Sequence, residues 1–330
     1  MGIHITSINN MAAVVRETQN NISDIAHGLG WKEMGIYAYP VHTDTDNDLS
    51  HRLDGIIASL QINDIAMIQY PTWNGHRFDQ ALAEKLKLYA RKLIIFVQDI
   101  TVMLLGRQEE VAEAVQRDIA IFEMADLLIL ASPKLYETLQ GYGLKNKNVM
   151  YQKIWDFPTH QLLTDHAPIR RMVFTGGENL NYYTGKTPIH QFSVQTYDRT
   201  PETNVIRHEF MEREALLREL AKGGFGLVFA DDALFYRYDC MNQPYKLASY
   251  LAAGLPVVVR KGCAHENFVK EQKIGFVVES VEEADSLISA LTDEEIMAYY
   301  RRVAEIQYLI TTGAYTRSLL AESVLRVMEL

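Results

Sequence analysis

The segment CMNQPYKLASYLAAGLPVVV, from Cys240 to Val259, has residue types at a spacing suited to holding a diphosphate. Pro244 stands where a helix would begin, since proline is favoured in the first helical turn. The N–H groups of such a turn point at a ligand and favour negative charge. Lys246 adds a positive charge suited to a phosphate oxygen, and Ser249, one turn later, offers a hydroxyl for a ribose. The alternative interpretation is an ordinary amphipathic helix whose lysine extends into solvent.

The segment FTGGENLNYY, from Phe174 to Tyr183, is a second place where backbone can approach an anion. Its two glycines permit close approach, and a following helix N-terminus would contribute its dipole. The nearby GKT at 185–187 is not a P-loop, because the position five residues before its glycine is Leu180. The first predicted strand is not followed by a GxGxxG pattern, which argues against an NAD enzyme.

Carboxylates that follow predicted strands are the candidates for acid–base chemistry. Asp99 comes after the apolar run KLIIFVQ, so we expect it at a sheet edge, as the general base for an attacking hydroxyl. Asp44, Asp46 and Asp48 form overlapping DxD motifs of the kind that hold a metal ion beneath a diphosphate. The favoured interpretation of this run is a solvated loop, or a capping run for a helix that starts near Leu49, and the metal site is the alternative. The ten histidines are scattered without metal-ligand spacing, so we expect no catalytic metal.

Composition places the chain among globular proteins and excludes several classes of function. Its 330 residues suggest two domains at roughly 150 residues each. The formal charge of −10 disfavours non-specific binding to nucleic acid or to an anionic membrane. Cys240 and Cys263 are too few for a disulfide framework, and no apolar run is long enough for a membrane helix, so we expect a cytoplasmic protein. Gly2 and Thr6 match a myristoylation pattern, but the isoleucines around them favour a first strand.

Short β-branched runs alternate with longer amphipathic stretches, which predicts βαβ units and parallel sheets. The expected strands of the first half are GIHITSI, GIYAYP, DIAMIQY, KLIIFVQ, DLLILAS and VMYQKIW, with helices over 14–29, 49–60, 78–91 and 109–125 and after Pro133. The expected strands of the second half are RMVFTG, HQFSVQTY, NVIRHEF, FGLVFA, LPVVVR and IGFVVE, with helices over 211–222, 246–253, 264–271, 281–291, 293–310 and 315–330.

The polar segment DFPTHQLLTDHAPIRR, which contains two prolines, separates the two alternating halves. We therefore expect an α/β protein of two Rossmann-like, doubly wound domains, at residues 1–156 and 170–313, joined by a linker at 157–169. Such sheets bind ligands at the carboxyl ends of their strands, so the domains are expected to face a central cleft.

The pattern N-x-P-x-K-x-x-S-Y-L-A-A-G-L-P-V, which begins at Asn242, resembles the C-terminal domain of GT-B glycosyltransferases. It is similar in particular to the second-step glucosyltransferases (glucosyltransferase 3 type) that extend O-linked GlcNAc on serine-rich-repeat adhesins of streptococci and lactobacilli. Two glutamates of the mainstream retaining enzymes fall on Met241 and Ser249, so the stereochemistry of that group does not transfer. ITSINN with 11–16, IQYPTWN, KLIIFVQDI and GLVFADD resemble further segments of the family, with Gln98 replacing a histidine.

The resemblance implies roles for residues in both domains. It implies a donor site made by Arg16 in a mobile loop, by Asn179, and by Asn242, Pro244, Tyr245, Lys246, Leu247, Ala248 and Ser249. We expect the acceptor in the first domain, near Thr6, Ser7, Tyr70, Trp73 and Asn74. It also implies that the last helix, at about 314–330, packs back on the first domain and that the protein is a homotetramer.

The resemblance implies transfer of glucose from UDP-glucose onto O-linked GlcNAc of an adhesin polypeptide, and we expect it to be metal-independent, with no cofactor besides the donor substrate. The same fold with UDP-GlcNAc or UDP-galactofuranose as donor is the first alternative. A non-catalytic GT-B-like partner subunit is the second, because both glutamates are missing. No nucleic acid or stable membrane insertion is expected.

Overall fold

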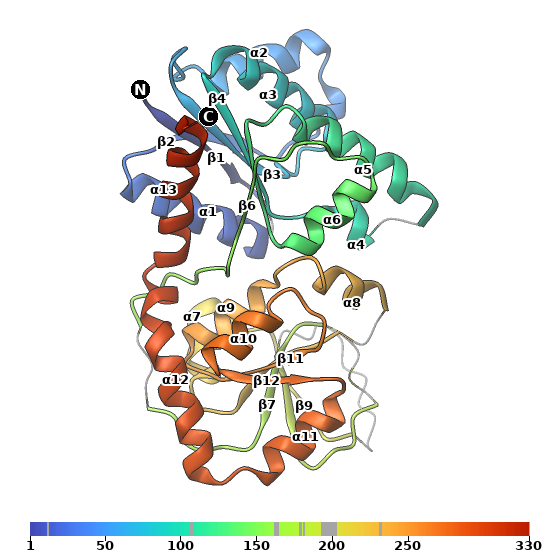
Figure 1. Cartoon of the computed structure of the whole chain (residues 1–330), viewed down its shortest axis with the longest axis vertical. Helices are drawn as coiled ribbons and strands as arrows, with labels where there is room; N and C mark the ends of the chain where they lie inside the picture. Colours follow the sequence, from blue (N-terminus) through green and yellow to red (C-terminus); the bar gives the residue numbers. More distant parts are fainter. Residues whose placement is uncertain are drawn as a thin grey trace. The chain divides into compact units, whose positions relative to one another are not determined.

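A computed structural model describes residues 1–11, 13–105, 108–161, 165–177, 180, 182–192, 203–230 and 233–329. The chain forms two compact units (Figure 1). The first unit contains Met1–Gln152 and Tyr315–Leu330, and the second contains Lys153–Ala314. The first unit thus ends four residues earlier than the domain boundary expected from the sequence, and the segment expected to be a linker belongs to the second unit. Asp156 and Phe157 are buried there.

The first unit is built on one parallel sheet in the order β2-β1-β3-β4-β5-β6. Its strands are β1 (Ile3–Asn9), β2 (Lys32–Tyr37), β3 (Ile65–Tyr70), β4 (Lys92–Val97), β5 (Leu127–Leu130) and β6 (Val149–Tyr151). The central strands β3, β4 and β5 are buried along almost their whole length, because helices cover both faces of the sheet.

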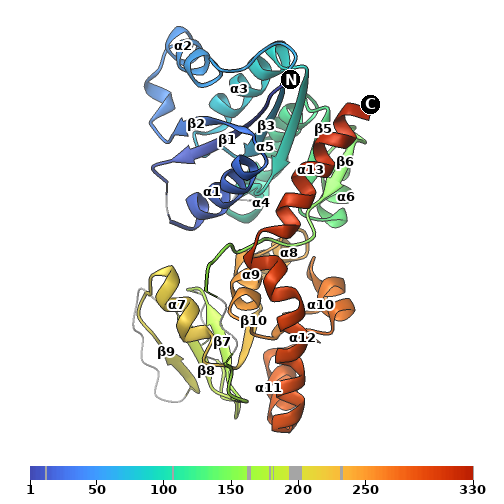
Figure 2. The same ribbon diagram turned by 90° about the vertical axis from the view of Figure 1, so that its left-hand side faces the viewer.

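The helices of the first unit are α1 (Ala13–Gly28), α2 (Asp46–Ile56), α3 (His76–Tyr89), α4 (Thr101–Leu105), α5 (Gln108–Phe122), α6 (Pro133–Gly141) and α13 (Ala314–Glu329), with a short 3₁₀ turn at Val41–Thr43. Helices α1 and α13 lie on one face of the sheet, and α2, α3 and α5 lie on the other (Figure 2). On α13, Arg326 donates to Asn148 of the first unit at 3.0 Å.

The acidic run at 44–48 starts a helix. Thr45 is the N-cap of α2, its side chain accepts from the Asp48 N–H, and the Asp48 carboxylate accepts from the Thr45 N–H. This capping box satisfies N–H groups that the first turn leaves without helical partners. The helix therefore begins at Asp46, three residues before the start expected at Leu49, and the capping interpretation of the acidic run is confirmed.

The second unit contains another parallel sheet, in the order β12-β11-β10-β7-β8-β9. Its strands are β7 (Met172–Thr175), β8 (Ile189–Phe192), β9 (Val205–Arg207), β10 (Phe225–Val228), β11 (Val257–Arg260) and β12 (Gly275–Val278). Its helices are α7 (Arg213–Leu220), α8 (Ala233–Asp239), α9 (Tyr245–Ala252), α10 (Glu266–Gln272), α11 (Val281–Ala290) and α12 (Asp293–Thr311). Helix α8 was not expected from the sequence, and it contains Tyr236 and Tyr238.

Helix α9 is fixed tightly on the sheet. The Tyr250 ring packs so closely over Gly226 of β10 that a side chain at position 226 would clash with it. The Tyr250 hydroxyl accepts from the Thr175 N–H at 2.8 Å. The helix stops before Gly254, whose φ of 78° lies in the left-handed region that favours glycine. This arrangement holds the N-terminus of α9 in a defined place on the second sheet. Within the part of the chain that the structure describes, no helix is long and apolar enough to cross a membrane.

Candidate functional site

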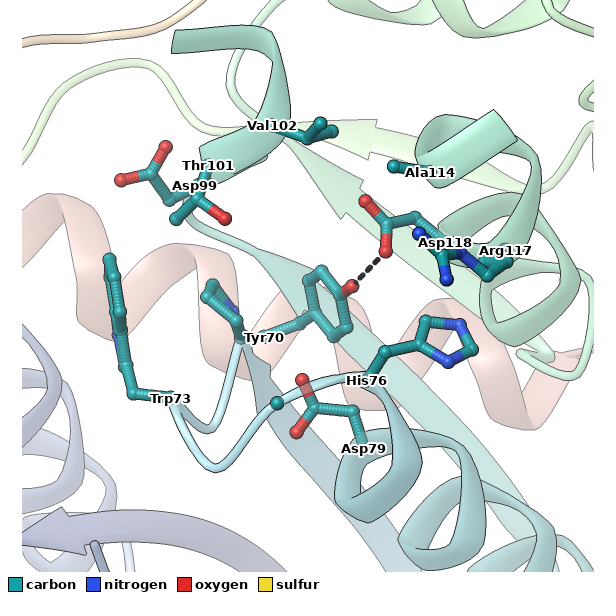
Figure 3. A pocket seen from close by; sticks show the side chains of 12 residues that line it. Tyr70, Trp73, His76, Asp79, Asp99, Thr101, Val102, Ala114, Arg117 and Asp118 are labelled. Carbon is teal, nitrogen blue, oxygen red and sulfur yellow. Dashed lines mark hydrogen bonds between the residues drawn. The ribbon is translucent and has the colours of Figure 1, made fainter. Parts of the chain in front are cut away.

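The first unit has a cavity of about 260 Å³ where β3 and β4 end. Its walls come from the chain after β3, from the first turns of α3 and from α4 and α5 (Figure 3). The lining residues are Tyr70, Pro71, Trp73, Gly75, His76, Asp79, Asp99, Thr101, Val102, Ala114, Arg117 and Asp118. Ligands of parallel α/β sheets bind beyond the carboxyl ends of the strands, so this position is typical of a functional site.

Tyr70 and Asp118 form a bonded pair in this cavity. The Tyr70 hydroxyl donates to Asp118 Oδ1 at 2.6 Å (Figure 3). Burial raises the pKa of the Asp118 carboxyl, and burial followed by the charge of Asp118 raises the pKa of the Tyr70 hydroxyl. The tyrosine ring packs edge-on against Phe122, with 5.0 Å between the ring centroids. Tyr70 is thus held as a neutral donor that orients one carboxyl of the cavity.

Asp79 is a second carboxyl of the cavity, and only 2% of the residue is exposed. Its Oδ1 accepts from the Thr72 hydroxyl and from the Thr72 N–H, the latter at 3.3 Å. Burial raises the pKa of Asp79 to about 7, and the Thr72 bonds only partly oppose that rise. Proton-transfer groups at active sites typically have a pKa near the working pH, and Asp79 meets that condition.

The loop after β3 carries an aromatic ring to the cavity. Trp73 has a φ of 61°, in a region where a non-glycine residue is strained, and Gly75 follows with a φ of 85°. Such strain persists where the surrounding structure enforces it, and it is frequent at binding sites. The indole stands on the same side of the cavity as Asp99 (Figure 3). A flat aromatic wall beside several carboxyls suits a sugar ring, whose apolar face stacks while its hydroxyls donate to oxygens.

The structure brings two of the five residues expected at the acceptor site, Tyr70 and Trp73, together with Asp99, the residue expected as the general base. Tyr70, Trp73 and Asp99 line the cavity, whereas Thr6, Ser7 and Asn74 do not. Thr6 and Ser7 are buried on β1, where Thr6 accepts from the Gln69 N–H at 2.8 Å and Ser7 donates to Glu33. Asn74 bridges backbone groups of residues 37 and 39. These three side chains hold neighbouring segments in place.

Asp79 and Asp118 were missed in the sequence, although a signal is present. Asp79 occupies the apolar face of α3 with Leu82, Ala83 and Leu86, at spacings of three, four and seven residues. Asp118 likewise continues the apolar row of Val111 and Val115 on α5. An acidic residue on the core-facing stripe of a helix is unusual, since charged side chains are almost never fully buried unless paired. That pattern would have found both carboxyls.

In the second unit, the chain before α9 is anchored by aromatic rings. Trp155 Nε1 donates to the Gln243 carbonyl at 2.7 Å, and the Tyr245 ring stacks on Phe157 with 5.4 Å between centroids. Pro244 is the N-cap of α9, which therefore has no side-chain cap. The predicted helix start at Pro244 is confirmed.

Lys246 lies in the first turn of α9, half-buried, with its Nζ 4.5 Å from the centroid of the Phe174 ring. A cation over an aromatic face is held in place by the ring quadrupole. Its positive charge and the helix N-terminus therefore meet at the same end of α9, beside the carboxyl end of β7. This combination suits an anionic ligand.

The remaining residues expected at the donor site differ in their freedom to bind. Leu247, Ala248 and Ser249 are buried, and the Ser249 hydroxyl donates to the Lys246 carbonyl at 2.7 Å, so the hydroxyl expected for a ribose is used within the helix. Asn242 is half-buried and its Nδ2 donates to the Tyr238 hydroxyl at 3.0 Å. Asn179 lies outside the described residues.

His265 was also missed, and it lies near Lys246. The residue is only 1% exposed, and within the described part of the chain neither ring nitrogen has a hydrogen-bond partner. Burial, followed by the positive charge of Lys246, lowers its pKa to about 4, so the ring is neutral at pH 7. It is the N-cap residue of α10 and follows β11, whose carboxyl end lies at the same edge of the sheet as that of β7.

Arg16 lies exposed on the first turns of α1, which begins at Ala13, as the helix expected over 14–29 predicts, and not in the mobile loop that the family resemblance implies. Two of the acidic residues of the DxD motifs form ion pairs. Asp44 pairs with Arg52 at 2.7 Å, and Asp46 pairs with Arg77 at 2.7 Å. Among the described residues, no group of three or more His, Cys, Asp or Glu is arranged to hold a metal ion.

Comparison with known families gives two matches that follow each other along the chain. Residues 2–154 match the model of the glucosyltransferase 3-like N-terminal domain, and residues 173–323 match that of the glucosyltransferase 3-like C-terminal domain. Glucosyltransferase 3 of Streptococcus parasanguinis is 33% identical over 334 residues, which cover 99% of each chain. Glucosyltransferase 3 of Streptococcus gordonii is 32% identical over 340 residues, covering 99% of this chain and 100% of the relative.

More distant similarities agree with this result. Beta-1,6-galactofuranosyltransferase WbbI of Escherichia coli strain K12 is 22% identical over 83% of each chain. The solved structure of Anabaena HepE in complex with UDP has a TM-score of 0.66 at 10% identity, covering 98% and 99% of the two chains. Sucrose-phosphate synthase of Thermosynechococcus elongatus has a TM-score of 0.62 at 10% identity, covering 99% of both. The expected fold of two Rossmann-like GT-B domains is confirmed.

Proposed function

We propose the reaction of this chain from one premise: the chain belongs to the glucosyltransferase 3-like family and is a glycosyltransferase. The proposed reaction moves glucose from UDP-glucose onto the O-linked GlcNAc of a serine-rich-repeat adhesin, without a metal ion. Its main support is the 33% identity to Glucosyltransferase 3 of Streptococcus parasanguinis over 99% of both chains.

The donor is assigned to the second unit. Lys246 and the first turn of α9 offer positive charge for a diphosphate, and Phe174 keeps the ammonium in place. Asn242 and Pro244 to Ser249 form the segment around it, and Arg16 and Asn179 complete the donor set that the family resemblance implies. Fixed positive groups that stabilise departing UDP take the part that a metal ion plays in other transferases, which supports metal independence.

The acceptor is assigned to the cavity of the first unit. Trp73 offers a stacking face, and Tyr70, Asp79, Asp99 and Asp118 offer oxygens to sugar hydroxyls. Carboxylates repel the phosphates of a nucleotide, so the cavity favours a neutral sugar over the donor. One of these carboxyls would take the proton of the attacking hydroxyl, and Asp99 is the candidate that the sequence provides.

A single incubation tests the donor, the acceptor and the metal together. The full chain is mixed with a GlcNAc-modified peptide and with UDP-glucose, UDP-GlcNAc or UDP-galactofuranose, each with and without EDTA, and the product is read by mass. We expect one added hexose from UDP-glucose, unchanged by EDTA. UDP binding without transfer from any donor would favour a non-catalytic subunit, and loss of transfer in EDTA would contradict metal independence.

Galactofuranosyl transfer is the second candidate, because the 22% identity to WbbI extends over 83% of each chain. Both candidate donors add a hexose of the same mass. Transfer from UDP-galactofuranose in the matched incubation, with none from UDP-glucose, would therefore identify this activity.

A further inference from the structure

Asp79 is the buried ionisable group of the cavity whose position needs an explanation beyond packing. It lies in the first turn of α3, beside the Tyr70 ring, and it lines the cavity (Figure 3). Within the described part of the chain, its hydrogen bonds come from Thr72 and no Lys, Arg or His pairs with it. A buried carboxyl without a cation is costly, and an asparagine would accept the same bonds from Thr72 at lower cost.

The groups around Asp79 shift its pKa in both directions. Burial and, to a smaller extent, the like charge of Asp118 on α5 raise the pKa, and Thr72 lowers it through two hydrogen bonds. Tyr70 on β3 stays protonated and donates to Asp118. Asp99 after β4, His76 on α3 and Arg117 on α5 also line the cavity, and the buried Nε2 of His76 has no hydrogen-bond partner among the described residues. With a pKa of about 7, Asp79 exchanges its proton near neutral pH.

We propose that Asp79 is the group that accepts the proton of the attacking sugar hydroxyl, while the Tyr70–Asp118 pair positions that hydroxyl. The inference rests on the proposed function, because it needs an acceptor sugar in the cavity. Asp79 therefore replaces Asp99 as the candidate proton acceptor. Asp99 is half-buried after β4 and lies on the same side of the cavity as Trp73 (Figure 3). In this arrangement, Asp99 and Trp73 hold the sugar ring on one side, and Asp79 receives the proton on another.

The proposed step balances in atoms and charge. The acceptor oxygen forms a bond to the anomeric carbon of the donor while the bond from that carbon to the β-phosphate oxygen breaks. The electron pair of the broken bond leaves with UDP, and the hydroxyl proton moves to the Asp79 carboxylate. A base on the protein is required in a displacement that inverts the anomeric carbon, so the transferred sugar is expected to have the opposite anomeric configuration from the donor.

The test compares Asp79→Asn with Asp99→Asn and with Asp54→Asn, an exposed acid on α2 that pairs with Lys85. Wild-type protein is assayed first on GlcNAc-modified peptide. Absence of transfer would reject the proposed function, and with it the role of Asp79 in that reaction. Where transfer is present, kcat for Asp79→Asn is expected to fall about 100- to 10,000-fold with little change in the acceptor KM. Asp99→Asn is expected to raise the acceptor KM, and Asp54→Asn to change neither constant.

The pH profile separates a proton acceptor from a structural carboxyl. In wild-type protein, kcat/KM for the acceptor is expected to rise with pH through a limb near the Asp79 pKa of about 7, and Asp99→Asn is expected to keep that limb. Thr72→Val removes one bond that lowers the pKa of Asp79, so the limb is expected to move to higher pH. This variant keeps Asp79 itself, so it remains informative even where Asp79→Asn does not fold.

Four results would overturn the inference. The first is near wild-type kcat in an Asp79→Asn protein that melts and binds UDP normally. The second is a pH profile in which the limb near pH 7 does not move in Thr72→Val. The third is a pH profile in which that limb disappears only in Asp99→Asn. Retention of the donor's anomeric configuration in the product would also contradict it.

Discussion

The cavity of the first unit and the N-terminus of α9 in the second unit occupy corresponding places, at the carboxyl ends of strands in two six-stranded parallel sheets. Their electrostatics are opposite. In the first, Asp79 lies near Asp118 and its pKa is raised, whereas in the second, His265 lies near Lys246 and its pKa is lowered. In both cases burial and a like charge shift the pKa of the buried group toward its neutral form.

The comparison teaches that one fold provides two kinds of site through a few side chains. Acidic walls and a tryptophan suit a neutral, hydroxyl-rich ligand and the movement of a proton. A lysine at a helix N-terminus suits an anion, and the uncapped first turn of α9 adds to that preference. The sheets alone do not distinguish the two roles, because the same architecture supports many functions.

Beyond the Asp79 variants described above, the largest effect is expected from removing the cation of the second site. Lys246→Ala should lower transfer about 100- to 1,000-fold, the usual loss when one preorganised group that stabilises a leaving anion is removed. Lys261→Ala is the matched control, since that lysine is exposed and pairs with Glu279. UDP affinity by calorimetry and turnover are measured for both. Equal values in Lys246→Ala and wild type would abolish the contrast between the two sites.

The pH dependence of stability should sharpen the comparison. The folded pKa of Asp79, about 7, lies above its ordinary 3.8, so its contribution to stability is complete below pH 3.8 and is lost as pH rises through 7. Between pH 5 and 8, wild type should lose roughly 2–3 kcal/mol more than Asp79→Asn, at 1.36 kcal/mol per pKa unit. His265 has the opposite sign, because its stabilising contribution is present above pH 6.5 and is lost as pH falls toward 4.

Urea unfolding of wild type and Asp79→Asn across this pH range measures the difference. Asp54→Asn should follow the wild-type curve, since it changes an exposed acid of the same unit. Parallel curves for wild type and Asp79→Asn would mean that Asp79 is not held protonated by its surroundings.

A smaller effect is expected from the aromatic wall of the first site. Trp73→Ala should raise the acceptor KM roughly 2- to 10-fold, as expected for about 0.5–1.5 kcal/mol of aromatic contact. The donor KM should not change. Alanine has the same difficulty as tryptophan at a φ of 61°, so the backbone strain is retained in the variant. Tyr89→Ala, on the exposed side of α3, serves as the control; a similar rise in that variant would show a general effect of aromatic loss.

Much of the fold and one of the two sites follow from the sequence. Apolar runs such as LIIFV predicted the buried central strands, and the proline and glycine around 245–252 predicted both ends of α9. Helix α8 was missed because its seven residues are too few for a periodic pattern. The start of α2 was predicted three residues too late, because the acidic run before Leu49 was not identified as a capping box. The cationic N-terminus of α9 was predictable because Pro244 and Lys246 lie within one helical turn of each other.

The sequence by itself determined the two alternating α/β halves, the position of α9 and the residues at its N-terminus, because these depend on local spacing. Only the tertiary structure placed Tyr70 beside Asp118, which is 48 residues away, and enclosed Asp79 so that its pKa rises to about 7. Burial and long-range contact set the protonation of a carboxyl, and neither is contained in the spacing of residues along the chain.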